Sequence, residues 1–301
     1  KLYNEFAIRH PNAFYLRTRQ RGMQNWDGKI KYITKTGQFK IGLLPSVYKR
    51  CIELGIKPII VDMRQPLPKV SKVVTQIGKY KLRPEQEKAV KAILSNKLGE
   101  TPFQIGVLDY TVNAGKTLIM SALYLSYKKQ LKTLLITNDS DWLNQARDEF
   151  KQYLPGEDIT FVQGKVLNWS NFTIGMVQSI SRNMKYYQNE LAKIDMVLID
   201  EADQGGSKQY QNVITRLFNT RVRIGLSGTI YMSKLAKDKV KNMNLRCFFG
   251  DVIAEFKLKD SIKKGYSTKT IVKTVEGKPW FGNWESDCMS YNEIYLSLIH
   301  I

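Results

Sequence analysis

The sequence predicts an α/β fold: a doubly wound parallel sheet preceded by a small basic α+β domain. From about residue 81 onward, short and continuous apolar runs alternate with longer amphipathic stretches, the pattern of parallel strands that helices cover on both faces. Charge sets the amino-terminal part of the chain apart. Residues 1–80 carry 16 Lys plus Arg and 4 Asp plus Glu, so a net charge of +12 out of the total of +20 lies there.

The amino-terminal domain, expected over residues 1–70, combines strand and helix patterns. KIKYITKT (29–36) alternates in the manner of a strand. A helix is expected through SVYKRCIELG (46–55), ending at its glycine, and the apolar run PIIVD (58–62) predicts a further strand. In QPLPKVSKV (65–73) two prolines disfavour a helix, so this segment is predicted to be an extended connector between domains.

The second domain is expected over residues 78–250, and its strands follow from apolar runs of four to six residues. The runs are FQIGVL (103–108), TLLIT (133–137), ITFV (159–162), FTIGMV (172–177), DMVLI (195–199) and VRIGL (222–226). Amphipathic stretches such as LIMSALYLSYKK (118–129) and DWLNQARDEFKQYL (141–154) lie between them and predict helices on the faces of the sheet. Residues 251–301 are expected to lie beyond this domain, because they show no further pattern of this kind.

Composition excludes several classes of function. No run of about 18 apolar residues exists to span a membrane. Three widely spaced cysteines and two histidines argue against a disulfide framework, a zinc site and a histidine-activated nucleophile. The net charge of +20 favours a polyanionic partner such as nucleic acid. The chain opens at Lys1 without a signal peptide, which predicts a piece of a cytoplasmic protein.

The stretch DYTVNAGKT (109–117) lies between a predicted strand and a predicted helix, where a phosphate-binding loop belongs. Such a loop needs a tight turn, a helix amino terminus, a lysine and a hydroxyl for magnesium. Gly115, Lys116 and Thr117 supply the turn, the charge and the hydroxyl, while Tyr110 stands where the pattern GxxxxGK[ST] opens with glycine. The alternative is a fortuitous AGKT at the start of an ordinary helix.

A second signal is the acidic stretch that ends the strand DMVLI. Asp200 and Glu201 follow this strand directly, and a carboxylate at that edge of a parallel sheet can hold magnesium together with Thr117. Glu201 is then placed to polarise an attacking water. The alternative is a cluster of acids that only favours a helix amino terminus. Together with the AGKT loop, the acids favour a nucleotide-hydrolysing site.

Four motifs in order carry a resemblance to a family: LRPEQ (82–86), TVNAGKT (111–117), LIDEAD (198–203) and GLSGT (225–229). They resemble the first RecA-like lobe, a P-loop NTPase domain, of a superfamily 2 helicase. In that superfamily the phosphate loop often begins with a residue other than glycine. The resemblance implies a RecA-like fold, the cofactors ATP and Mg²⁺, and a nucleic-acid partner.

The resemblance also implies roles for individual residues. Adenine would be recognised by Arg83 and Gln86. The phosphates would be bound by Thr111, Asn113, Ala114, Gly115, Lys116 and Thr117, and the magnesium by Thr117 and Asp200. The catalytic residues would be Lys116, Asp200 and Glu201. Hydrolysis would be coupled to movement by Asp203, Ser227 and Thr229.

The amino-terminal segments RGMQNWDGKIKYI (21–33) and FKIGLLPSVYKRCIELGIKPIIVD (39–62) are similar to the leading domain of UvsW-type phage recombination helicases. Basic residues here are interleaved with aromatic ones, which suits contact with phosphates and bases. The candidates are Arg17, Arg19, Arg21, Trp26, Lys29 and Lys31. For Trp26 alone, a place in the domain core is the favoured alternative.

Two further segments occupy places where the family contacts the nucleic-acid backbone. TNDSDWLNQ (137–145) lacks the usual Pro-Thr, and in IGMVQSI (174–180) Met176 replaces a small polar residue. Gln145 and Gln178 are the candidate contacts in these segments.

The expected function is that of an ATP-dependent DNA helicase or translocase acting on branched or duplex nucleic acid. The resemblance implies a second lobe with an arginine finger, for which no pattern exists in this sequence, so the chain alone is expected to bind ATP weakly and not to unwind a duplex. If a phage encodes it, its compartment would be the host cytoplasm. Two alternatives stay open: a restriction or packaging-type DNA translocase, and a non-enzymatic nucleic-acid-binding module with a vestigial nucleotide site.

Overall fold

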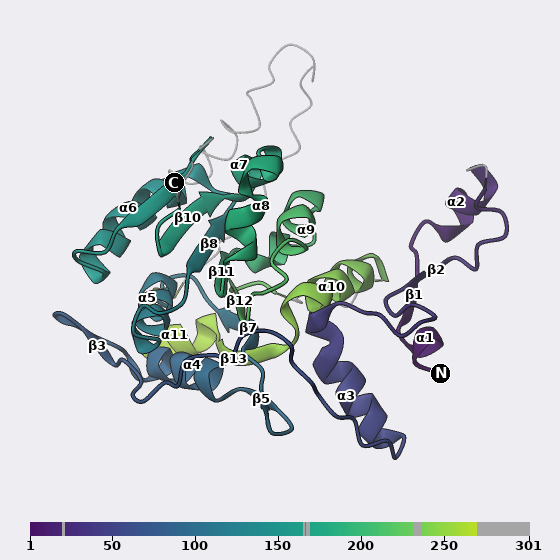
Figure 1. Cartoon of the computed structure of the whole chain (residues 1–301), viewed down its shortest axis with the longest axis horizontal. Helices are drawn as coiled ribbons and strands as arrows, with labels where there is room; N and C mark the ends of the chain where they lie inside the picture. Colours follow the sequence, from purple (N-terminus) through teal and green to yellow (C-terminus); the bar gives the residue numbers. More distant parts are fainter. Residues whose placement is uncertain (20–21, 165, 167–168, 231–235, 270–301) are drawn as a thin grey trace, which may run out of the picture. The chain divides into compact units, whose positions relative to one another are not determined.

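The structure is a computed structural model that describes residues 1–19, 22–164, 166, 169–230 and 236–269. Lys1–Ser267 form one compact unit built around a seven-stranded sheet (Figure 1). The order of the strands is β13-β7-β12-β11-β8-β10-β9, and every neighbouring pair is parallel. The predicted parallel sheet is confirmed. The boundary expected at residue 70 stays a prediction, because no division of this unit is seen there.

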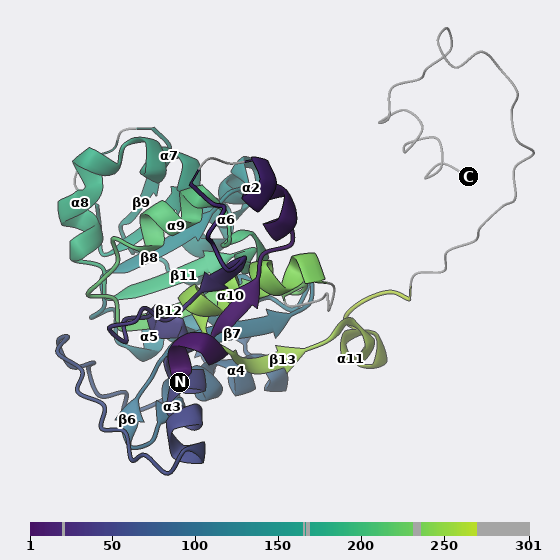
Figure 2. The ribbon, with the colours of Figure 1, turned by 90° about the vertical axis from the view of Figure 1, so that its right-hand side faces the viewer.

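Six of the seven strands lie within two residues of the predicted apolar runs. The strands are β7 (Ile105–Tyr110), β8 (Thr133–Thr137), β9 (Ile159–Val162), β10 (Phe172–Met176), β11 (Met196–Asp200), β12 (Val222–Ser227) and β13 (Val252–Phe256). The seventh, β13, extends the sheet past Gly250, where the lobe was expected to end (Figure 2). It was not predicted because an edge strand is not buried on both faces: Val252 and Glu255 are exposed, so its sequence shows no continuous apolar run.

Helices cover both faces of the sheet, as a doubly wound fold requires. They are α4 (Pro84–Ser95), α5 (Lys116–Ser126), α6 (Ser140–Tyr153), α7 (Val177–Arg182), α8 (Met184–Ala192), α9 (Lys208–Ile214), α10 (Ala236–Phe249) and α11 (Leu258–Lys263). Figure 1 shows α4, α5 and α6 on one face and α8, α9 and α10 on the other. Each face has its own hydrophobic core: Leu118 and Phe150 lie in the first, and Tyr187 and Leu245 in the second.

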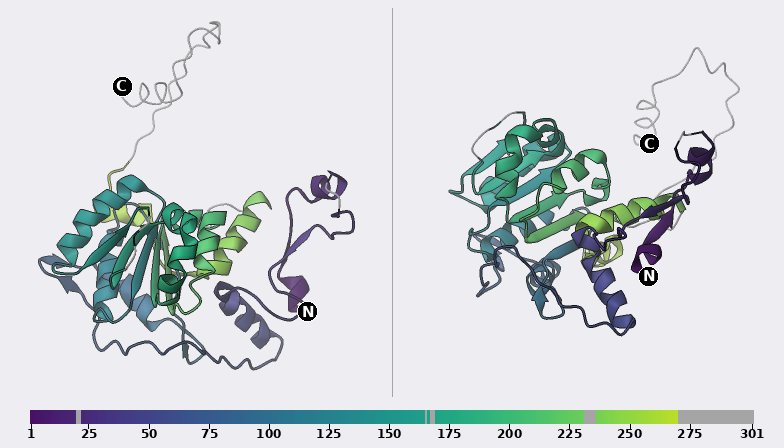
Figure 3. Two further views of the ribbon diagram at one scale, coloured as in Figure 1. Left: turned by 45° about the horizontal axis from the view of Figure 1, so that its top comes forward. Right: turned by 45° about the vertical axis from the view of Figure 1, so that its right-hand side comes forward.

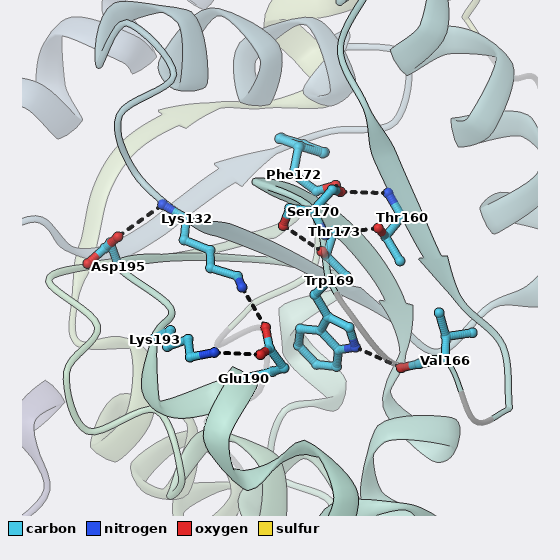
Figure 4. Close-up of polar contacts among 10 residues, drawn as sticks. All are labelled: Lys132, Thr160, Val166, Trp169, Ser170, Phe172, Thr173, Glu190, Lys193 and Asp195. Carbon is cyan, nitrogen blue, oxygen red and sulfur yellow. Dashed lines mark hydrogen bonds and ion pairs between the residues drawn. The ribbon is translucent and has the colours of Figure 1, made fainter.

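Polar side chains tie together the edge of the sheet at which its strands begin (Figure 4). Ser170 and Thr160 exchange hydrogen bonds, since each main-chain N–H donates to the other residue's side-chain oxygen at 2.9 Å. Lys132 donates from its main-chain N–H to Asp195 Oδ2 at 3.0 Å and from Nζ to Glu190. Burial would raise the pKa of Glu190, but Lys132 and a second lysine outweigh it and hold that pKa below its usual value. These contacts fix where β8 to β11 start, and hence where their carboxyl ends emerge.

The amino-terminal residues form short elements. They are α1 (Leu2–Glu5), β1 (Ala7–Arg9), α2 (Ala13–Arg19), β2 (Lys29–Lys31), the 3-10 helix η1 (Ile41–Leu43) and α3 (Leu44–Glu53). The predicted helix over 46–55 is confirmed by α3, and the predicted strand over 29–36 is confirmed for β2, which pairs antiparallel with β1. Figure 3 shows α3 beside α10. The 3-10 helix η1, directly before α3, approaches α10 so closely that a Cβ on Gly42 would lie 2.1 Å from the carbonyl oxygen of Arg246.

The strand predicted over residues 58–62 is wrong. This segment carries no strand assignment, and the side chains of Ile59 and Val61 are 89% and 74% exposed. An apolar run becomes a strand only where a sheet edge can pair with it, and the sheet is bordered by β9 and β13 instead. The remaining strands form two hairpins: β3 (Gln76–Ile77) with β4 (Tyr80–Lys81), and β5 (Lys97–Leu98) with β6 (Thr101–Pro102).

Candidate nucleotide and nucleic-acid site

The sheet brings three of the sequence motifs to one edge. β12 lies between β7 and β11, and the register pairs Ser227 with Asp109 and Asp200 with Leu226. The carboxyl ends of these three parallel strands therefore emerge side by side. The phosphate loop, the acidic loop and the GLSGT segment follow them directly, so residues far apart in sequence meet at this edge.

The phosphate loop begins after a tyrosine that belongs to the strand. Tyr110 is the last residue of β7, is fully buried, and donates its hydroxyl to the carbonyl of Glu85 at 2.8 Å. The turn is made instead by Asn113 and Gly115, which have φ angles of 63° and 71°. Gly115 caps the amino terminus of α5, and a Cβ there would lie 2.3 Å from Gln86 Nε2. Glycine is thus required at position 115 and not at position 110.

The two residues expected to recognise adenine also hold the loop. Gln86 is 2% exposed; its Nε2 donates to the carbonyl of Ala114 at 2.8 Å and its Oε1 accepts from the N–H of Arg83 at 2.9 Å. Arg83 Nη1 reaches the carbonyl of Asn113 at 3.5 Å. A glutamine amide has two N–H donors and two acceptor lone pairs, so one donor and one acceptor of Gln86 are left for a ligand.

Lys116 lies between the two carboxylates of the acidic loop. Its Nζ is 3.6 Å from Asp200 Oδ1 and 3.4 Å from Glu201 Oε1. The Asp200 side chain is 3% exposed, and its burial raises the pKa of its carboxyl, which the nearby Lys116 opposes. Glu201 has a φ of 49°, a conformation that costs a non-glycine residue about 1–3 kcal/mol and is often found at functional sites. Its side chain is 39% exposed and can reach solvent.

The residues expected to hold magnesium suit that ion. Asp200 Oδ1 is buried without a hydrogen-bond partner, so it is available to a cation. Thr117 is buried in the first turn of α5. Within the described ranges, no group of three or more His, Cys, Asp or Glu side chains could hold a metal by itself. Mg²⁺ fits such a site because it takes one or two protein oxygens and completes its shell with phosphate oxygens and water.

The three residues expected to couple hydrolysis to movement are brought together. Ser227 Oγ donates to Asp203 Oδ1 at 3.0 Å and lies 3.3 Å from Thr229 Oγ1. Gly228, between them, packs on the phosphate loop, since a Cβ on it would lie 3.1 Å from Thr111 Cα. The end of β12 therefore contacts both the acidic loop and the phosphate loop.

Of the two glutamines expected to contact nucleic acid, only one is linked to the acidic loop. Gln178 Nε2 donates to the carbonyl of Asn138, whose own Nδ2 donates to Gln204 Oε1. Gln145 is exposed on α6 and hydrogen-bonds to Glu149 at 2.7 Å. The sequence analysis missed Asn138 and Gln204. Their positions, directly after β8 and directly after LIDEAD, were the available signal.

Some of the amino-terminal candidates are exposed, and others contact neighbouring residues of the same segment. Arg17, Arg19 and Lys29 are exposed. Lys31 pairs with Asp27 at 2.9 Å. Arg21 lies outside the described residues. The indole N–H of Trp26 donates to the carbonyl of Lys29 at 3.0 Å, and the ring is half-buried against His10.

A cavity of about 510 Å³ joins the amino-terminal residues to the acidic loop. His10 and Asn12 line one side of it, and Asp203, Gln204 and Lys241 line the other. The basic amino-terminal segment therefore reaches the same edge of the sheet as the motifs. In the part of the chain that the structure describes, none of the helices has the length and apolar character needed to cross a membrane.

Residues 79–232, just over half of the chain, match the family described as "Type III restriction enzyme, res subunit". The chain belongs to this family. Two curated relatives of this chain are helicases by name. "ATP-dependent DNA helicase uvsW" of Enterobacteria phage T4 is 23% identical over 272 residues, covering 83% of the chain and 51% of the relative. A putative ATP-dependent RNA helicase of Acanthamoeba polyphaga mimivirus is 26% identical over 147 residues, covering 48% of the chain and 27% of the relative.

The chain thus spans about half the length of the phage relative and about a quarter of the mimiviral one. The crystal structure of the UvsW helicase from Bacteriophage T4 superposes with a TM-score of 0.65 at 21% identity, covering 84% of this chain and 91% of that one. The RecA-like fold and the resemblance to superfamily 2 helicases of the UvsW type are confirmed.

Proposed function

We propose that this chain carries the nucleotide-binding half of an ATP-dependent motor, a helicase or translocase that acts on branched or duplex DNA. The observation that carries the proposal is the position of Lys116, whose Nζ lies 3.6 Å from Asp200 and 3.4 Å from Glu201. When phosphate and a cation bind together, the lysine can pair with the phosphate and the carboxylates can bind the cation.

The groups around Lys116 would each have a different role in ATP hydrolysis. The free N–H groups at the start of α5 and the dipole of that helix favour phosphate oxygens, and Lys116 adds a charge next to them. Thr117 and Asp200 would hold Mg²⁺, which would neutralise the charge that develops on the phosphates during hydrolysis. Glu201, which reaches solvent, would orient and deprotonate the attacking water.

The amino-terminal residues supply a surface for the DNA. Arg17 and Arg19 are exposed on α2, and Arg19 lies over the ring of Tyr15, with 5.0 Å between the guanidinium carbon and the ring centroid. Phe14 and Tyr15 on the same helix are 80% and 55% exposed. Cations next to exposed aromatic rings suit phosphate contact combined with base stacking. The phage relative, named as a DNA helicase, supports DNA as the partner.

Full activity in this proposal needs a second lobe. A RecA-like motor closes over ATP between two lobes, and an arginine from the second one stabilises the transition state, an effect of several orders of magnitude in rate. We assign this lobe to the part of the phage relative that this chain does not match. Residues 251–301 were expected to begin the connection to it, but β13 and α11 pack on the first lobe, so only the residues after α11 would lead toward it. A restriction-type translocase stays the second candidate because of the description of the matching family.

The test is binding of a fluorescent ATP analogue with Mg²⁺, followed by binding of a branched DNA in the presence and absence of that analogue. Lys116→Ala should reduce nucleotide affinity by at least tenfold. Lys151→Ala, which removes an exposed lysine from α6, is the matched control and should bind as the wild type does. Equal affinity of the Lys116 variant and the wild type would contradict the proposal. DNA binding without nucleotide binding would identify a binding module instead.

A further inference from the structure

The segment that follows β13 folds back onto the predicted adenine-recognition motif. Lys257 pairs with Asp109, the residue before the last one of β7. Lys264 Nζ lies 2.7 Å from Glu85 Oε2, and the guanidinium of Arg83 lies over the ring of Tyr266. Residues 257–266 thus contact the LRPEQ motif and the end of β7 at three points. None of the four sequence motifs includes this segment.

The contact between Arg83 and Tyr266 is a cation–π contact. The guanidinium carbon of Arg83 lies 4.1 Å from the centroid of the Tyr266 ring, well inside the range of a cation–π interaction. Arg83 is further restrained because its Nη1 points to the carbonyl of Asn113 in the phosphate loop. A guanidinium is planar and has two faces, so Tyr266 covers one face and leaves the other for a second flat group.

Tyr266 is itself held in place. Its main-chain N–H donates to the carbonyl of Ser261 at 2.9 Å, closing the turn after α11. Its ring lies 6.4 Å from that of Phe256, and Phe256 lies 6.0 Å from Tyr110 of β7. A row of three aromatic rings therefore runs from the strand before the phosphate loop to Arg83, and it packs against the hydrophobic core of that face.

The ion pair next to this row anchors the segment. Glu85 is only 6% exposed, and Lys264 is the cation paired with it in the described residues. A buried carboxylate that loses its partner is strongly destabilising, so Glu85 retains Lys264. The hydrogen bond to Glu85 also raises the pKa of Lys264. The lysine over the ring of Phe256, at 5.4 Å, joins the ion pair to the aromatic row.

We propose that Tyr266 is a positioning residue for the nucleotide base: it fixes the plane of the Arg83 guanidinium so that the base stacks on the opposite face. The inference rests on the proposed function and adds to it a contact from outside the sequence motifs. Tyr266 acts through Arg83 and need not touch the nucleotide itself. Its effect is therefore confined to ligands that have a base.

The test compares the binding of two ligands to five proteins: the wild type, three single variants and one double variant. ATP and inorganic tripolyphosphate both occupy a phosphate loop, but only ATP carries a base to stack on Arg83. Tyr266→Ala should weaken ATP binding by roughly three- to tenfold and leave tripolyphosphate binding unchanged. Tyr266→Phe keeps the ring and should bind ATP as the wild type does. In an Arg83→Ala background, Tyr266→Ala should have no further effect, because the two residues act as a unit.

The outcomes separate this inference from the proposed function. If the wild type binds both ligands and Tyr266→Ala weakens both equally, the residue has only a structural role and the inference is wrong. It is equally wrong if Tyr266→Ala binds ATP as tightly as the wild type, or if its effect persists undiminished in the Arg83→Ala protein. If the wild type binds neither ligand, the proposed function fails and the inference fails with it.

Discussion

Ser227 Oγ donates a hydrogen bond to Asp203 Oδ1 at 3.0 Å, joining the end of β12 to the loop that follows β11. The N–H of Thr229 in turn donates to Ser227 Oγ at 3.2 Å. We expect that a shift of the acidic loop on nucleotide binding would reach the chain after β12 through this buried hydroxyl. Such a contact is suited to transmit the state of the nucleotide to the DNA.

Ser227→Ala should reduce the coupling between DNA binding and nucleotide binding without abolishing the binding of either ligand. Reciprocal linkage requires that DNA and nucleotide change each other's affinity by the same factor, and this factor should fall toward one in the variant. The variant should also lose roughly 1–2 kcal/mol of stability, because Asp203 loses a donor. The measurement is the ATP-analogue dissociation constant with and without DNA. The exposed Ser95→Ala is the control, and a full coupling factor in Ser227→Ala would contradict the role.

Gly115→Ala should damage the phosphate loop more than a glycine replacement elsewhere. An alanine at φ 71° is strained by about 1–2 kcal/mol, and its Cβ would also displace the Gln86 side chain, breaking its contact with Ala114. Gly156→Ala is the matched control, since Gly156 has a φ of 76° with open space around its Cβ position.

In thermal unfolding, both glycine variants should lose a similar amount of stability from backbone strain. Only Gly115→Ala should lose further stability, and only this variant should bind ATP at least tenfold more weakly. Equal losses in the two variants would mean that the approach of Gln86 has no role in the loop.

Asp200→Asn should stabilise the ligand-free protein near neutral pH. Burial raises the pKa of Asp200 in the folded chain above the ordinary value that it has when unfolded. Between these two pKa values the folded state binds more protons, so the free energy of unfolding falls as pH rises through that interval. The variant carries no charge to bury, and its advantage over the wild type should shrink as pH is lowered toward the ordinary pKa.

The same substitution should have the opposite effect once ligand is added. Mg²⁺ with ATP should raise the melting temperature of the wild type and fail to raise that of Asp200→Asn. Asp148→Asn, at an exposed position on α6, is the control. An Asp200→Asn protein that is less stable than the wild type at pH 7 would show that the pair with Lys116 outweighs the cost of burial.

DNA binding should weaken steeply with salt and should depend on α2. Each phosphate contact contributes a slope of about −0.9 to the logarithm of affinity against the logarithm of salt concentration for duplex DNA. Replacing both Arg17 and Arg19 by alanine should therefore reduce the magnitude of the slope by nearly two. Lys88→Ala with Lys151→Ala removes the same charge from exposed positions on α4 and α6. The same slope in both double variants would rule out α2 as the contact.

The sequence allowed most of the sheet to be predicted because buried parallel strands are continuous apolar runs. It failed at β13, whose edge position exposes Val252 and Glu255, and at residues 58–62, which are apolar but have no strand to pair with. Both failures have one cause. A local apolar pattern indicates burial, but it does not indicate whether a neighbouring strand is available for pairing. Only the three-dimensional arrangement of the sheet supplies that information.

The site could be predicted residue by residue where a motif fixes both spacing and chemistry. Lys116, Asp200 and Glu201 converge as expected, and Ser227 reaches Asp203. The contact made by Tyr266 could not be foreseen, because it depends on how the segment after β13 folds back onto the LRPEQ motif. The nucleic-acid residues stay predictions, since charge and exposure are shared by many surface side chains.

The segment that was wrongly predicted as a strand has a practical consequence for handling the protein. Ile59, Val61 and Met63 alternate with less exposed neighbours, so one side of this extended stretch presents three apolar side chains to solvent. An extended stretch of this kind is a template for intermolecular β-pairing and aggregation. Concentrated samples should therefore self-associate through this stretch, and a lysine in place of Val61 offers a way to keep the protein dispersed.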